Sequence, residues 1–108
     1  MTPLTRDELK KMNEQQHEDF VLINVLAPSA FNKAHIRTSV NVPVDEDGFA
    51  ERVESIAGDK DRKIVVYCAS FDCDASEQAA EKLEAAGFTA VYDYEGGTRD
   101  WFAQRNAA

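Results

Sequence analysis

The residues best suited to chemistry are two cysteines, Cys68 and Cys73, which are separated by four residues. Cys68 directly follows Ile64–Tyr67, the most strand-like run of the chain, and a helix-like segment follows the loop. Backbone N–H groups at the start of a helix stabilise a thiolate and any anion held beside it. The position predicts a nucleophilic role for Cys68, although a free cysteine that ends a strand is also commonly a small buried apolar side chain.

Apolar strand-like runs alternate with helix-like segments along the whole chain. The expected strands are 20–25, 40–42, 64–67 and 89–92. The expected helices begin near residues 5, 28, 49, 75 and 98. The first has a capping box of Thr5 and Glu8. The fourth is expected to end at Gly87, and Thr98 is expected to cap the last. This alternation predicts one α/β domain over residues 1–108, whose ligands bind beyond the carboxyl ends of parallel strands.

Several segments, in this order, resemble single-domain members of the rhodanese-like family. They are Asn24–Ile36, Asn41–Pro43, Ile64–Cys68, Ser76–Leu83, Gly87–Phe88, and Gly96–Gly97 with Trp101. The resemblance covers nearly the whole chain and implies a central parallel sheet with helices on both faces. It also implies that a loop cysteine takes sulfane sulfur from a small donor such as thiosulfate and passes it, as a persulfide, to a thiol or other thiophilic acceptor, which could be a protein. Cys68 matches that cysteine, and the chemistry needs no metal and no organic cofactor.

The loop after Cys68 departs from the family pattern. The family loop has six residues and ends with a basic residue before the helix serine. Here Ser76 lies eight positions after Cys68, and Ala75 replaces the base. The expected active-site loop comprises Ala69, Ser70, Phe71, Asp72, Asp74, Ala75 and Ser76. Its two aspartates would repel a dianionic donor, so we expect weak turnover with thiosulfate.

Cys73 leaves two alternatives to simple sulfur transfer open. A second thiol in the loop could attack a persulfide or sulfenic acid on Cys68, which would make Cys73 a resolving thiol and the chain a thiol-redox module. The acidic loop would also suit a rhodanese-fold binding or regulatory module with weak catalysis. A trapped persulfide, a disulfide, or neither would distinguish the three.

Other thiol and metal chemistries fit the sequence poorly. Phosphatases with this type of loop need an arginine six positions after the cysteine, where this chain has Asp74. The cysteine spacing is not the Cys-x-x-Cys of thioredoxin-like proteins. Zinc would have to use Cys68 and Cys73 with His17 and His35, which have no paired ligand spacing. We therefore expect no metal site.

The remaining candidate side chains are expected to have structural roles. His35 is expected to bond the local backbone, and His17, among acidic and amide residues, to lie on the solvated surface. Trp101 and Phe102 are expected in the core. Arg99 is the nearest candidate for a replacement cation, but we expect it on the surface at the start of the last helix.

The composition limits the partners. The formal net charge is −8 and the pI is near 4.6, which disfavours polyanionic partners, so we expect neither nucleic acid nor a membrane. The first residues lack the order of a secretory signal, so we expect a cytoplasmic protein with reduced thiols.

Overall fold

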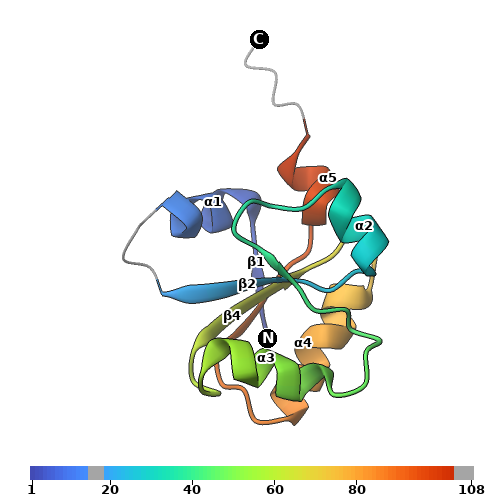
Figure 1. Cartoon of the computed structure of the whole chain (residues 1–108). Coiled ribbons are helices and arrows are strands. Elements are labelled where there is room, and N and C mark those ends of the chain that lie inside the picture. Colours follow the sequence, from blue (N-terminus) through green and yellow to red (C-terminus); the bar gives the residue numbers. More distant parts are fainter. Residues whose placement is uncertain (15–18, 104–108) are drawn as a thin grey trace.

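The computed structural model describes residues 1–14 and 19–103, which form a five-stranded sheet covered by helices (Figure 1). The strands are β1 (Thr2–Leu4), β2 (Phe20–Asn24), β3 (Val40–Asn41), β4 (Lys63–Tyr67) and β5 (Val91–Tyr94). The helices are α1 (Arg6–Glu14), α2 (Pro28–Lys33), α3 (Phe49–Ala57), α4 (Ala75–Ala85) and α5 (Gly97–Trp101). None of the helices in these residues has the length and apolar character needed to cross a bilayer.

All strand pairs of the sheet are parallel, in the order β1-β5-β4-β2-β3. The predicted α/β class with a central parallel sheet is therefore confirmed. In the register, Tyr67 of β4 lies beside Asn24 of β2 and Tyr94 of β5, and Tyr94 lies beside Leu4 of β1. The strands thus end together, and the segments that follow them meet at one edge of the sheet.

Two hydrophobic clusters fill the two faces of the sheet. On one face, Ile64 and Val66 of β4 share a cluster with α3 and α4, in which Leu83 is fully buried. On the other face, Val65 and Tyr67 share a cluster with Leu9 of α1, and Trp101 of α5 packs against it. The alternation along β4 places successive side chains on opposite faces, as a strand requires. The helices on both faces agree with the expectation (Figure 1).

The predicted capping box begins α1 as expected. The Thr5 amide donates to Glu8 Oε1 at 2.9 Å, and the Glu8 amide donates to Thr5 Oγ1 at 3.2 Å. Strand β1, immediately before it, was not predicted, because three residues including Pro3 carry no strand pattern. Proline is tolerated there because β1 lies at the edge of the sheet.

Two further predictions were wrong in detail. The strand expected at 89–92 lies at Val91–Tyr94, because Thr89 bonds instead to the loop before β4, with its amide on Lys60 O and its hydroxyl on Asp61 Oδ1. Thr98 does not cap the last helix. That helix begins at Gly97, and the Thr98 hydroxyl donates to Ala69 O at 3.3 Å.

Candidate active site

The loop that carries both cysteines runs from the end of β4 to the start of α4. Its first residues are fixed by α5, whose Thr98 amide donates to Cys68 O at 3.0 Å and whose Arg99 amide donates to Ala69 O at 2.8 Å. Gly97 makes this approach possible, with a φ of 64° and a bare Cα against the backbone of Cys68 and Ala69. A glycine is required wherever the backbone is left-handed and another chain segment packs this closely. Cys68 and Ala69, which form the stem of the loop, are therefore fixed by α5. The exposed residues Phe71, Asp72 and Asp74 form the loop tip.

Cys68 has no exposed surface. Its thiol donates to Cys73 O at 3.3 Å and to Ser76 Oγ at 3.7 Å. Burial raises the pKa of the Cys68 thiol, and its hydrogen bond with the Cys73 side chain raises the pKa further, whereas the amide and hydroxyl of Ser76 lower it. The net pKa lies above the ordinary value, so the thiol form of Cys68 is favoured.

Cys73 is half-buried and makes a turn in which its amide donates to Ser70 O at 3.1 Å. Burial raises the pKa of its thiol, and so does the charge of Asp74. Hydrogen bonds from the Ala69 amide, the Cys68 side chain and the Ala75 amide lower the pKa and outweigh both effects. The net pKa of Cys73 lies below the ordinary value, and the carbonyl oxygen of Cys73 accepts the Cys68 thiol.

The other predicted loop residues divide by exposure. Ala69, Ser70 and Ala75 are half-buried, and Ser76 is buried in the first turn of α4. The exposed residues are Phe71, Asp72 and Asp74, and the Phe71 side chain leaves 71% of its surface in solvent. The loop therefore presents one aromatic ring and two carboxylates to an approaching molecule.

The Ser76 side chain connects the thiols to a buried carboxyl that sequence reasoning missed. Asp93 lies in β5, is 3% exposed, and accepts a hydrogen bond from Ser76, while its Oδ1 has no partner among the described residues. Burial raises the pKa of Asp93, the Ser76 bond lowers it, and the charges of Glu95 and Glu77 raise it. The sequence carried one signal, an aspartate within the strand Val91–Tyr94. It was overlooked because the strand predicted at 89–92 ended one residue before Asp93.

Replacing Asp93 by asparagine should change how stability depends on pH. Because the folded pKa of Asp93 is raised, the folded chain holds the proton more tightly than the unfolded chain does. As pH rises above about 4, the ordinary aspartate pKa, wild type should lose stability relative to Asp93→Asn, by about 1.4 kcal/mol for each unit by which the folded pKa is raised. Denaturant unfolding from pH 4 to 7 measures this difference. Asp72→Asn, at an exposed carboxylate, is the control, and an Asp93→Asn curve parallel to wild type would contradict the prediction.

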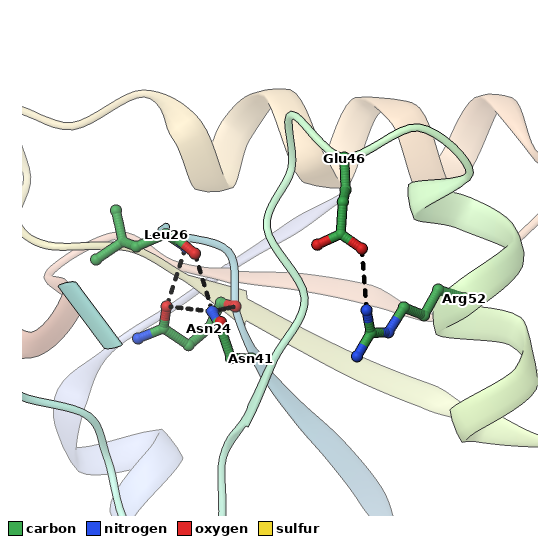
Figure 2. Close-up of polar contacts among 5 residues, drawn as sticks. All are labelled: Asn24, Leu26, Asn41, Glu46 and Arg52. Atoms are coloured by element: carbon green, nitrogen blue, oxygen red, sulfur yellow. Dashed lines mark hydrogen bonds and ion pairs between the residues drawn. The ribbon is translucent and has the colours of Figure 1, made fainter. Parts of the chain in front are cut away.

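Two asparagines link the ends of β2 and β3 by hydrogen bonds (Figure 2). Asn24 Oδ1 accepts the Leu26 amide at 2.9 Å, and Asn41 Nδ2 donates to Leu26 O at 2.9 Å and Asn24 O at 3.1 Å. Nearby, Arg52 of α3 pairs with Glu46 at 2.9 Å in the segment that enters this helix. These neutral and paired groups brace the rim of the site and bring no unpaired positive charge to it.

His35 has a local role, and Arg99 reaches the loop only through its backbone amide. His35 is exposed, stacks on Phe31 with ring centroids 3.9 Å apart, and contacts Phe31 O through Nδ1 at 2.8 Å, which confirms its local structural role. His17 falls outside the described residues. Arg99 contacts the loop through its amide and its side chain is exposed, as expected. Phe102, expected in the core, is 57% exposed, so that prediction was wrong, whereas Trp101 packs against the core cluster.

A cavity of about 330 Å³ lies beside the loop tip and was not predicted. Phe71 lines one side, and β1, the start of α1 and the turn before α5 line the others. Arg6 lies at its wall, where the guanidinium is 5.7 Å from the ring centroid of Trp101. The cavity thus places an aromatic ring, one cation and the carboxylates of Asp7, Glu95 and Asp100 next to the loop.

Comparison with known proteins agrees with this geometry. The sequence profile of the rhodanese-like domain matches residues 5–104, which include the cysteine loop and every strand of the described sheet except β1. The chain belongs to the rhodanese-like family.

Individual relatives and solved structures point the same way. A thiosulfate sulfurtransferase GlpE from Pseudomonas syringae is 31% identical over 101 residues, which span 94% of this chain and 90% of that protein. The rhodanese-like domain of an Anabaena sp. protein, solved by NMR, is 28% identical with a TM-score of 0.80, over 95% of this chain and 74% of that one. A rhodanese with anions from E. coli is 30% identical with a TM-score of 0.64, over 80% of this chain and 94% of that one.

Proposed function

We propose that this chain is a sulfurtransferase that carries sulfane sulfur as a persulfide on Cys68 and passes it to a thiol or another thiophilic acceptor. The observation that carries the proposal is the position of Cys68. It lies at the carboxyl end of the central strand, beneath a loop in which Cys73 O accepts its thiol, and against the first turn of α4. A sulfur anion at this point is stabilised by the Ser76 amide and hydroxyl and by the helix start.

The acceptor approaches from the side of the loop tip in this proposal. The cavity beside Phe71 has room for a small thiol or for one side chain of a protein acceptor. Asp7, Glu95 and Asp100 line it together with Arg6, so its charges do not favour an anionic acceptor. The whole chain acts as one rhodanese-like domain, without a metal or organic cofactor, in a reducing compartment such as the cytoplasm.

A reversible Cys68–Cys73 disulfide is the second candidate function. The nearness of the two residues favours it: the Cys68 thiol already donates to Cys73 O at 3.3 Å, so only a small movement of the loop would bring the two sulfurs together. The third alternative is a binding or regulatory module that has lost turnover. In that module the same site would bind sulfur compounds without passing sulfur on.

Intact mass spectrometry after exposure to thiosulfate, a polysulfide and an alkyl persulfide in turn tests the proposal. Wild type should gain one sulfur atom from at least one donor and lose it again when a small thiol is added. The Cys68→Ser/Cys73→Ser double variant is the control and should gain none. Loss of two hydrogens without gained sulfur would favour the disulfide function. Loaded sulfur that no thiol removes would favour the binding module.

A further inference from the structure

The two thiols differ in their access to a donor. Cys68 is fully buried, and its hydrogen is directed into the site, toward Cys73 O and Ser76 Oγ. Cys73 is partly exposed and belongs to the projecting half of the loop. A donor that arrives from solvent therefore meets the sulfur of Cys73 before that of Cys68.

The local electrostatics agree with this difference in access. Burial raises the pKa of both thiols, but the Ala69 and Ala75 amides bring the pKa of Cys73 below its ordinary value, whereas the pKa of Cys68 stays above it. Because the thiolate is the nucleophile, exposure and thiolate stability both favour Cys73 as the first nucleophile.

We propose that Cys73 is the thiol that first accepts sulfane sulfur, and that it passes this sulfur to Cys68. This inference rests on the proposed function, in which Cys68 is the final carrier. It assigns the first displacement to the residue that sequence analysis treated only as a possible resolving thiol.

The two displacements balance without an outside oxidant. In the first, the Cys73 thiolate attacks the outer sulfur of the donor, the donor's S–S bond breaks, and its remaining part leaves with the electron pair, as sulfite when the donor is thiosulfate. In the second, Cys68 sulfur attacks the outer sulfur on Cys73, and the S–S bond to Cys73 breaks. The Cys68 proton, which in the resting site is donated to Cys73 O, moves to the departing Cys73 sulfur. Cys73 ends as a thiol and Cys68 as a persulfide anion.

Rapid-quench loading with glutathione persulfide tests the order. Samples are blocked with iodoacetamide at intervals and mapped by peptide mass. In wild type, sulfur should appear on Cys73 before Cys68. Cys68→Ser should load Cys73 at close to the wild-type rate, and Cys73→Ser should load Cys68 at least about tenfold more slowly, because Cys68 is buried and favoured as a thiol. Cys68→Ala repeats the measurement should the buried serine hydroxyl prevent folding.

Three results distinguish the proposed order of loading from the proposed sulfurtransferase function itself. Loading of Cys68 at the wild-type rate in Cys73→Ser would overturn the inference and leave the proposed function intact. Iodoacetamide labelling of unloaded protein gives a second readout, and faster labelling of Cys68 than of Cys73 would also overturn the inference. Absence of loading in wild type and in both single variants would overturn the proposed function itself.

Discussion

A protein carrying Gly97→Ala should be destabilised by about 3 kcal/mol or more and should load little sulfur. The added Cβ would lie 2.3 Å from Cys68 O and 2.7 Å from the carbonyl carbon of Ala69, both backbone atoms that cannot turn aside. The φ of 64° adds the left-handed penalty of a residue with a side chain. Relief requires α5 to move away from the loop stem, which lengthens the bonds from the amides of Thr98 and Arg99. Denaturant unfolding and intact mass after persulfide treatment measure the two effects.

Gly48→Ala is the matched control for this variant. Gly48 has a φ of 76°, but nothing lies within 4 Å of the position its Cβ would occupy. Its replacement should cost only the backbone term, about 1–2 kcal/mol, and should leave sulfur loading unchanged. If the two variants lost equal stability, the close approach of Gly97 to the loop stem would not be the cause.

Replacing Asp72 and Asp74 together by asparagine should raise the thiosulfate rate by roughly 3- to 30-fold at low salt. Both side chains are exposed on the loop, where their charges oppose an approaching dianion. Asp74 also raises the pKa of Cys73, so its neutral replacement lowers that pKa and shifts the pH profile of loading toward acid. Thiosulfate-dependent thiocyanate production measures the rate, and neutral persulfide donors should respond much less.

Ionic strength and a second pair of variants complete this test. Added salt should narrow the gap between the variant and wild type, because the Debye length falls from roughly 10 Å at 0.1 M to about 3 Å at 1 M. Glu51→Gln with Glu81→Gln, at exposed positions on α3 and α4, removes the same number of charges and should change the rate little. An unchanged rate in the asparagine variant would assign weak turnover to the missing basic residue or the longer loop.

The elements that sequence analysis located were those with strong local signals. The β-branched run that ends at Tyr67, the capping box of Thr5 and Glu8, and Gly87 after α4 each act within a few residues, so each is visible in the sequence. Strand β1 is not visible in this way, because its three residues become a strand only by pairing with β5. The same reason explains the shift of β5, whose boundary depends on where Thr89 finds its partners in the loop before β4.

The candidate site was located by topology, but its internal arrangement was not. The rule that ligands bind at the carboxyl ends of parallel strands pointed directly to Cys68. Which thiol faces solvent depends on the path of the loop and on the carbonyls that α5 binds, and no spacing in the sequence encodes that path. The carboxyl of Asp93 was missed for the same reason, since its contact with Ser76 exists only once α4 packs on β5.

The pairing of β1 with β5 has a consequence for how the chain is made. Leu4 lies beside Tyr94, whereas β2 and β4 pair residues such as Asn24 and Tyr67, much closer in the sequence. During synthesis on a ribosome, β2, β3 and β4 can therefore associate while β1 still has no partner. Strand β1 stays unpaired, with the side chain of Leu4 exposed, until residue 94 has left the exit tunnel. Completion of this sheet therefore follows the emergence of β5, and a nascent chain stalled before that point offers the unpaired edge of β4 to chaperones or to other chains.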